Sequence, residues 1–244
     1  MYNYAVNNPI KVIYPDGRDA IYTFDPKTNT ITVTAAIYYQ SAGFGKMGDE
    51  GKQKNMDWIN KQLKEIYKDG MVKIGEQTYT VKFDVKAEIK DVKEKDLKRG
   101  ENIMNIDTNV QRDNVSTGGK GPGVNDIGTI ATPGTIADIH EIGHMLGFKD
   151  RYTDYENASN LSDWRSIAHD GYQNDLMGSG GQNLNQSHYD DVVNYTNFKL
   201  VQGQRHLLPQ YRSNSVSPSG MIDENRQSSV NPADVPTGWR PSKK

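Results

Sequence analysis

The sequence predicts an α+β fold, and three features indicate it. Residues 30–39 are rich in β-branched and aromatic side chains, and residues 77–89 alternate between apolar and polar ones, so both segments are expected to be strands. Between them, apolar residues recur at spacings of three and four, which predicts an amphipathic helix over residues 52–68. A second helix is expected to begin near Thr135, which stands at capping-box spacing from the acidic residue three positions later.

The chain is expected to divide into a short lead, one folded domain and a polar tail. Residues 1–29 are polar and rich in turn signals, with short β-like pieces at residues 10–14 and 20–24. The folded domain is placed at residues 30–202. Residues 203–244 are rich in Ser, Asn, Pro, Gln and Arg, which predicts a mostly flexible tail or linker with few core positions.

Shorter elements are expected inside the domain. Residues 103–107 and 128–132 have the composition of short strands, whereas residues 116–123 contain four glycines and predict a loop. A long polar stretch at residues 149–175 follows the second helix. A last helix is then expected over residues 188–200, where apolar side chains form a stripe that can be buried.

The composition limits the classes of function. A net charge of -2, from 29 Lys and Arg against 31 Asp and Glu, gives no electrostatic reason to expect nucleic acid or an anionic membrane as a partner. The chain has no cysteine, which excludes disulfides, thiolate catalysis and cysteine-based zinc sites. No apolar run is long enough to span a bilayer, and the first residues do not resemble a secretory signal. If the protein is exported, we expect that a signal was removed or lies on a longer parent chain.

The segment from His140 to His144 carries the most specific chemistry. Its pattern, His-Glu-Ile-Gly-His, places two imidazoles at positions i and i+4, so that both lie on one face of a helix and can reach one metal ion. Glu141 lies on the same turn, where its carboxylate can take a proton from a water molecule on the ion and pass it to a leaving amine. The alternative is an exposed polar helix face with two unrelated histidines.

The residues after this motif supply a third candidate ligand. Gly147 stands where a left-handed glycine would end the helix, so that the chain can fold back and offer Asp150 to the same ion. A carboxylate oxygen is a competent zinc ligand, and three protein ligands would leave a fourth position open, as in catalytic zinc sites. His140, His144 and Asp150 are therefore the candidate zinc ligands, and Glu141 is the candidate catalytic residue.

The run from His140 to Asp150, with a Leu-Met-Gly turn at Met177 downstream, resembles the metzincin metallopeptidases. The aspartate at the third-ligand position is most similar to the small snapalysin-type branch of that family. The resemblance implies a zinc-dependent endopeptidase of protein or peptide substrates, with a twisted mixed sheet over an active-site helix and a helical C-terminal subdomain. It also implies a methionine turn beneath the zinc and an edge strand at residues 128–132 that pairs with extended substrate.

Two departures from the family pattern leave alternatives open. Ser179 stands where astacin-like relatives carry a tyrosine ligand, and the usual third histidine is absent, so Asp150 rests on the snapalysin resemblance. His169 is an alternative third ligand or a stabiliser of the oxyanion. Other candidate donors to the oxyanion are Tyr152, Tyr155 and Tyr172. The competing function is a metzincin-like binding module that has lost catalysis, against which the intact Glu141 argues.

The lead carries a second resemblance. Tyr2-Asn3-Tyr4, Asn7-Asn8-Pro9 and Pro15-Asp16-Gly17-Arg18 are similar to the end of an Rhs-repeat core, although Tyr14 replaces the aspartate that usually precedes the last motif. The resemblance implies that the chain is the C-terminal effector of a larger polymorphic toxin, secreted or delivered to another cell. A cognate immunity protein would then block it in the producing cell. The alternative is a generic pair of turns.

Overall fold

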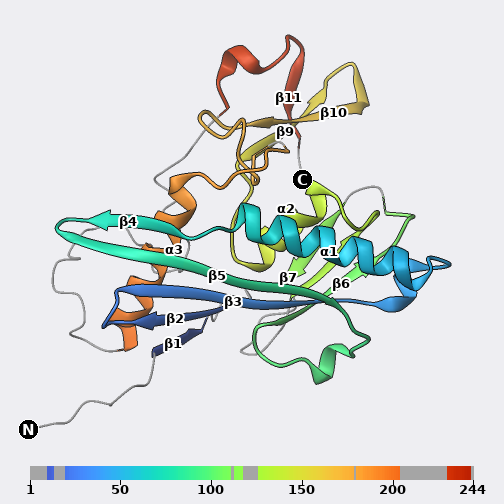
Figure 1. Cartoon of the computed structure of the whole chain (residues 1–244). Coiled ribbons are helices and arrows are strands. Elements are labelled where there is room, and N and C mark those ends of the chain that lie inside the picture. The colour runs from blue at the N-terminus through green and yellow to red at the C-terminus, as the bar shows by residue number, and fades with distance from the viewer. Residues whose placement is uncertain are drawn as a thin grey trace, which may run out of the picture.

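Helices and strands are mixed in the described part of the chain, so the α+β fold class is confirmed (Figure 1). The described part contains three α-helices, an eight-stranded sheet and a three-stranded sheet. The turn motifs of the lead, Ser179 and most of the expected tail lie outside the described residues. The computed structural model describes residues 10–13, 20–110, 113–117, 126–178, 180–203 and 230–242.

The larger sheet is built around β3 (Thr30–Tyr39). Along one side, β3 pairs in parallel with β5 (Gln77–Ile89) over its whole length. Along the other side, its first half pairs with β2 (Ile21–Asp25), which is antiparallel, and its second half pairs with β6 (Glu101–Ile106), which is parallel. Next to β6 lies β8 (Asp126–Ile130), again in parallel, and it leads directly toward the motif helix.

Three further strands complete this sheet, each antiparallel to its neighbour. β1 (Ile10–Ile13) pairs with β2, β4 (Gly70–Ile74) with β5, and β7 (Asn114–Thr117) with β8. Strands β1 and β2 come from the lead, so the sheet begins before residue 30. Because β7 lies outside β8, the expectation that residues 128–132 form the edge strand is wrong, and β7 is the edge on this side of the sheet among the described residues.

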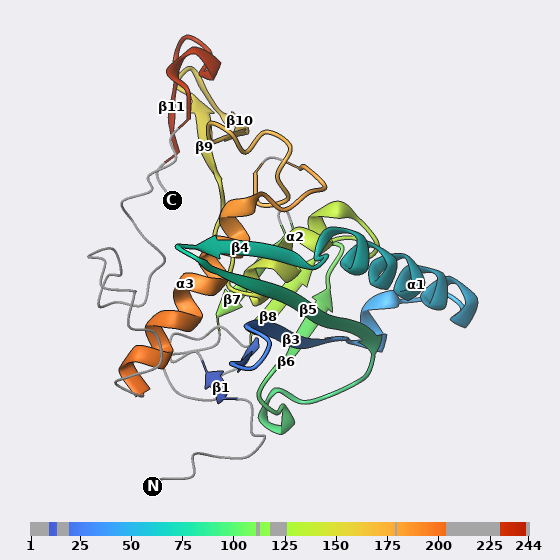
Figure 2. The same cartoon turned by 60° about the vertical axis from the view of Figure 1, so that its left-hand side comes forward.

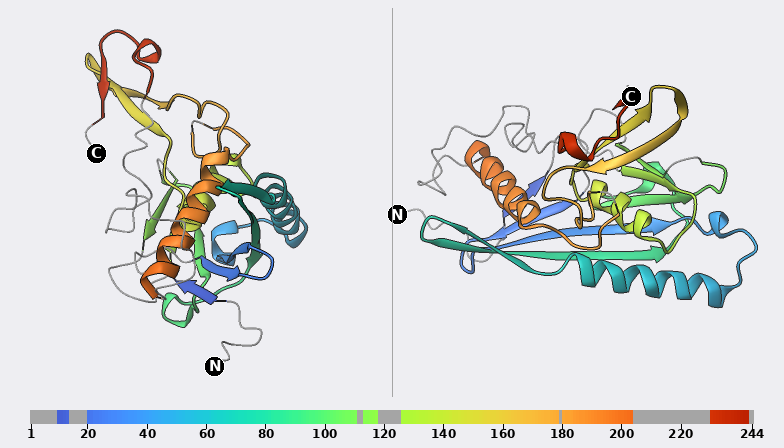
Figure 3. Two further views of the ribbon diagram at one scale, coloured as in Figure 1. Left: turned by 90° about the vertical axis from the view of Figure 1, so that its left-hand side faces the viewer. Right: turned by 90° about the horizontal axis from the view of Figure 1, so that it is seen from above.

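One face of the larger sheet carries the hydrophobic core. Alternate residues of β3 from Ile31 to Ile37 are buried, and the residues between them are half-buried. Buried residues of three helices pack with those of the sheet in this core (Figure 3). These helices are α1 (Asp49–Ile66), α2 (Ile136–Met145) and α3 (Gln186–Gly203).

The helices agree with the predicted periodicity. α1 corresponds to the helix expected over residues 52–68, and α3 begins two residues before the predicted start. The residues of α1 that the spacing marks as apolar are all buried, namely Met56, Ile59, Leu63 and Ile66. None of the helices in the described ranges is long and apolar enough to cross a membrane.

The C-terminal part is not mostly helical, which corrects the expected helical subdomain. A three-stranded antiparallel sheet, in the order β10-β9-β11, stands beyond α2 on the side away from the large sheet (Figures 1 and 2). β9 (Tyr152–Asn157) and β10 (Asn160–Ala168) arise from the polar stretch, and β11 (Trp239–Pro241) arises from the expected tail. These strands are too polar to show the alternation on which the prediction of strands depends.

Buried tyrosine hydroxyls attach α2 to the surrounding elements. Tyr22 of β2 donates a hydrogen bond to the Leu146 carbonyl, 2.7 Å away, directly after the helix. Tyr67, at the end of α1, donates to the Ile139 carbonyl at 2.8 Å. The motif helix is therefore joined to the sheet and to α1 by polar contacts as well as by apolar packing.

A third tyrosine acts on a charged group. Tyr39, at the end of β3, donates a hydrogen bond to the carboxylate of Asp138 in the first turn of α2, and the Gly134 N–H donates to its other oxygen at 3.1 Å. Burial raises the pKa of Asp138 to about 7, although the hydrogen bonds from Tyr39 and Gly134 lower it. The Tyr39 hydroxyl therefore donates to an ionised Asp138 carboxylate above neutral pH and to the neutral Asp138 carboxyl group below it.

This arrangement predicts a pH-dependent effect of Tyr39→Phe. At pH 8.5, where Asp138 is ionised, the substitution should lower the free energy of unfolding by about 1–3 kcal/mol, because a buried carboxylate loses a donor. At pH 5.5 the loss should be smaller. Tyr67→Phe is the matched control, with a loss of about 0.5–1.5 kcal/mol at both pH values, because its partner is a neutral carbonyl. Urea unfolding of the metal-free variants measures both, and a pH-independent loss for Tyr39→Phe would contradict the assignment.

Candidate metal centre

The helix that carries the motif begins and ends where the sequence predicts. Thr135 precedes α2, and its hydroxyl accepts a hydrogen bond from the Asp138 backbone N–H at 3.3 Å. Gly147 has a φ of 93°, a left-handed conformation that favours glycine, and the Phe148 N–H then donates to the Gly143 carbonyl at 2.9 Å. The chain thus reverses directly after the second histidine and returns toward α2.

Both histidines of the motif are oriented through Nδ1. Nδ1 of His140 lies 2.8 Å from the carbonyl oxygen of Leu176, and Nδ1 of His144 lies 2.9 Å from that of Phe148. Because a carbonyl oxygen can only accept, each Nδ1 carries a proton, which leaves Nε2 as the atom of each ring that can bind a metal ion. Metal-binding histidines are held in this way, with the second ring N–H donated to a carbonyl or carboxylate.

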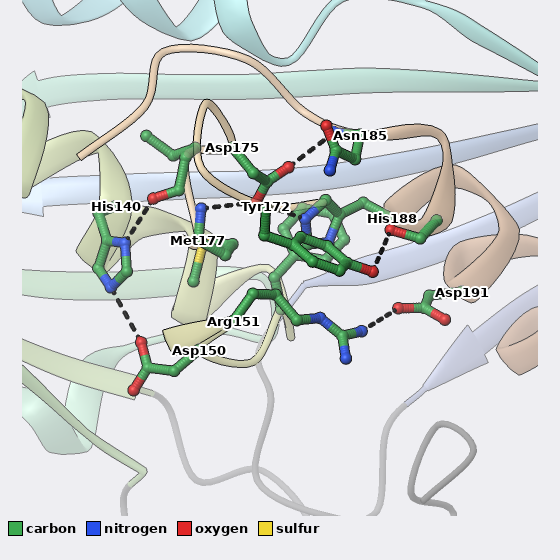
Figure 4. Close-up of polar contacts among 12 residues, drawn as sticks. His140, Asp150, Arg151, Tyr172, Asp175, Met177, Asn185, His188 and Asp191 are labelled. Carbon is green, nitrogen blue, oxygen red and sulfur yellow. Dashed lines mark hydrogen bonds and ion pairs between the residues drawn. The ribbon is translucent and has the colours of Figure 1, made fainter. Parts of the chain in front are cut away.

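Asp150 reaches the same point in space as the two histidines. Its Oδ1 lies 3.1 Å from Nε2 of His140 (Figure 4). The same oxygen lies 3.2 Å from Nε2 of His144. In a tetrahedral site with ligand distances of roughly 2.0–2.1 Å, two ligand atoms lie about 3.3–3.4 Å apart. Both distances from Asp150 are therefore close to the spacing of two ligand atoms on one small ion.

Glu141 lies beside the ligating atoms. One of its carboxylate oxygens and the ring nitrogens of His140 and His144 lie within 4.8 Å of one another, so these three residues form a cluster that could hold a metal ion. The residue is only 7% exposed. Burial raises the pKa of Glu141, although the neighbouring His144 and His140 lower it. A buried carboxylate of this kind is a suitable proton acceptor.

The contacts between Asp150 and the two histidines shift the pKa values of Asp150 and His144. Burial alone would raise the pKa of Asp150, but the hydrogen bonds to His140 and His144 outweigh it and hold this pKa well below its usual range. Burial lowers the pKa of His144, but the hydrogen bond with Asp150 and the negative charges of Asp150 and Glu141 together outweigh it, so this pKa is raised. A metal ion would compete with a proton for the same atoms, so metal binding should release protons.

The turn that contains Met177 packs against the motif helix. It is closed by a hydrogen bond from the Gly178 N–H to the Asp175 carbonyl at 3.0 Å, and Met177 is fully buried. A Cβ atom at Gly143 would lie 2.6 Å from Sδ of Met177, so the glycine between the two histidines allows the turn to approach the helix. The same turn supplies the carbonyl that orients His140.

A cleft of about 480 Å³ opens over one side of the cluster, a volume typical of substrate sites (roughly 300–1,000 Å³). Its lining includes Asp113, which directly precedes β7, and Tyr152 and Ser166 of the hairpin of β9 and β10. The remaining lining residues are Ile136, Ala137, His140, Glu141, Gly178 and Gly180.

The three tyrosines considered as oxyanion donors lie at different places. Tyr152 lines the cleft, and the centroid of its ring is 6.0 Å from that of His140. Tyr172 donates its hydroxyl to the Ser187 hydroxyl at 2.8 Å, on the side of α3 (Figure 4). Tyr155 is in β9 and does not line the cleft. Tyr152 is therefore the tyrosine that the fold brings to the metal cluster.

His169, the alternative third ligand, is engaged elsewhere. Its Nε2 lies 3.0 Å from the Thr153 hydroxyl, and its backbone N–H donates to the Arg151 carbonyl at 2.7 Å. Burial lowers the pKa of His169, and the neighbouring Arg151 lowers it further. Asp150 rather than His169 contacts both histidines of the motif.

Four polar residues next to the site, three of them buried, were not predicted from the sequence as functional. Asp175 pairs with His188, and Arg151 pairs with Asp191. The partners are 13 and 40 residues apart in the chain, so no local pattern could have indicated them.

Comparisons of the chain with protein-family models, with curated proteins and with solved structures gave no match. The chemistry of the site therefore rests on its own geometry. That geometry brings His140, His144 and Asp150 to one point, with Glu141 beside it.

This geometry predicts which substitutions weaken metal binding. Asp150→Ala should weaken zinc binding by at least about tenfold, because it removes an oxygen that contacts both ligating nitrogens. His169→Ala should leave the affinity nearly unchanged. Competition titration with a zinc-binding dye gives both dissociation constants, and the reverse order would move the third ligand to His169.

Proposed function

We propose that the chain is a zinc-dependent endopeptidase that hydrolyses protein or peptide substrates. The observation that carries the proposal is the convergence of His140 Nε2, His144 Nε2 and Asp150 Oδ1, with Glu141 beside them in an open cleft. Two imidazoles and one carboxylate, with a fourth position free, are a typical donor set of catalytic zinc sites. A binding module without catalysis would have no use for a buried carboxylate at the position of Glu141.

The chemistry divides between the ion and Glu141. Zinc bound at this centre would polarise the scissile carbonyl and lower the pKa of a water molecule toward about 7. Glu141 accepts a proton from the attacking water, and burial favours this step because it raises the proton affinity of the carboxylate. Glu141 then gives the proton to the amide nitrogen as the C–N bond breaks, so the products are a carboxylic acid and an amine.

The cleft suits an extended peptide chain. β7 is the edge of the larger sheet among the described residues, and a substrate strand can add to such an edge through main-chain hydrogen bonds. Tyr152 lines the cleft next to His140. We assign to its hydroxyl the stabilisation of the negative charge that develops on the carbonyl oxygen.

The test of this function is Glu141→Gln. The amide keeps the shape of the carboxylate but cannot take the proton of the water, so casein cleavage should fall by at least about 100-fold while one zinc per chain is retained. Glu65→Gln, an exposed position on α1, is the matched control and should cleave normally.

Two results would contradict the proposal in different ways. Near wild-type cleavage by Glu141→Gln would remove the role assigned to that residue. A wild type that is folded and loaded with zinc, but that cleaves neither casein nor a peptide library, would favour the binding module.

We further propose that the peptidase is the effector end of an Rhs-type toxin that acts on proteins of a target cell. The support is the lead, where Asn7-Asn8-Pro9 and Pro15-Asp16-Gly17-Arg18 come shortly before the hydrolase. A toxin of this kind requires a cognate immunity protein in the producing cell, and the cleft is the surface that such an inhibitor would block.

Expression inside a bacterium tests the toxin proposal. The wild type should arrest growth and Glu141→Gln should not, because toxicity would depend on hydrolysis. Growth curves of the two strains, at equal protein levels, give the answer. Equal growth, with the wild type shown to be folded and zinc-loaded, would favour a peptidase that acts outside cells.

A further inference from the structure

Helix α3 carries two buried polar side chains that the proposed chemistry does not use. His188 is fully buried and Asp191 is 6% exposed. They are three residues apart, so they lie on the same face of the helix. This face points toward the turn of Met177 and toward the residue after Asp150 (Figure 4).

His188 holds the turn through Asp175. Its Nε2 lies 2.8 Å from Oδ1 of Asp175. The same carboxylate accepts the backbone N–H of Met177 at 2.9 Å on Oδ1, and that of Asn185 at 2.7 Å on Oδ2. The turn fixed in this way presents the carbonyl that accepts from Nδ1 of His140.

The contact pattern of His188 identifies its tautomer. Nδ1 is buried and has no hydrogen-bond partner in the described part of the chain. A buried N–H without an acceptor would be costly, whereas Nε2 has a carboxylate to donate to. Nε2 therefore carries the proton, and His188 of α3 donates this hydrogen bond to Asp175 of the turn.

Asp191 holds the other side of the metal centre through Arg151. Its Oδ2 accepts from a guanidinium nitrogen of Arg151 at 2.9 Å, and both side chains are largely buried. Arg151 directly follows Asp150, and its backbone N–H donates to the Met177 carbonyl at 2.6 Å. The loop of Asp150 and the turn of Met177 are thus joined to each other and to α3.

We propose that His188 and Asp191 are positioning residues of the metal centre, one for His140 and the other for Asp150. This inference rests on the proposed zinc site and names the part of the fold that keeps its ligands in place. Ligands that are fixed before the ion binds lose little freedom on binding, so loosening either connection should weaken metal affinity. Neither residue touches the substrate or the ion.

The first test replaces His188. His188→Leu removes the donor and keeps apolar bulk, and it should weaken zinc binding by about tenfold, the lower end for partners of metal ligands. His188→Gln retains an N–H near the position of Nε2 and should restore most of the affinity. Val192→Ala, at another buried position of α3, removes packing without any hydrogen bond to the turn and should leave the affinity unchanged.

The second test replaces the ion pair as a unit. Arg151→Met combined with Asp191→Leu removes both buried charges together, so that neither is left unpaired and the fold is retained. Zinc binding should again weaken by about tenfold, because the loop of Asp150 loses its connection to α3.

A readout on the metal-free protein separates this inference from the proposed function. Exchange of the Met177 and Asn185 amide hydrogens should be faster in His188→Leu than in Val192→Ala, because Asp175 is no longer held. If His188→Leu fails to fold, Asp175→Asn, which keeps the histidine but replaces one accepting oxygen, carries the same expectation.

The outcomes are distinct. Zinc affinity within about twofold of wild type in His188→Leu and in the Arg151/Asp191 double variant would overturn the positioning role and leave the peptidase proposal intact. Equal loss of affinity in His188→Leu and Val192→Ala would reduce the role to general packing and also overturn it. A folded wild type that binds no zinc would remove the proposed function itself, and this inference with it.

Discussion

The hydrogen bond between Nδ1 of His140 and the carbonyl of Leu176 is the interaction on which the candidate site depends. It joins the motif helix to a turn 36 residues later in the chain and directs Nε2 of the histidine toward Asp150. His144 is oriented by a carbonyl only four residues away, within the turn that ends its own helix. One ligand is therefore set by local geometry, whereas the other requires the whole fold to bring the turn to α2.

The packing around α2 explains how that hydrogen bond is maintained. On the side of the sheet and α1, buried tyrosine hydroxyls donate to the helix or to the residues next to it. In addition, α3 holds the turn and the loop of Asp150 through buried polar pairs. Gly143 allows the turn to pack closely against the helix. Because unpaired polar groups are costly in a buried place, the arrangement leaves few alternative positions for the ligands.

Strong local patterns explain what could be predicted from the sequence. Helical periodicity predicted α1 and the shared face of His140 and His144, while Thr135 and Gly147 marked the two ends of α2. β9, β10 and β11 have polar sequences without alternation, so they could not be predicted, and the helical subdomain expected in their place is absent from the described ranges. The order of β7 and β8, and the pairing of His188 with a residue of the turn, depend on tertiary contacts that no local pattern contains.

The central claim is that one ion is held by three side chains, with a fourth position left free. Anomalous diffraction at the zinc edge, from crystals of the zinc-loaded protein, tests it most directly. The account predicts a single peak within about 2.0–2.2 Å of Nε2 of His140, Nε2 of His144 and a carboxylate oxygen of Asp150, with no fourth side chain. A peak at another place, a peak bound by His169 instead of Asp150, or a site closed by a fourth protein ligand would contradict it.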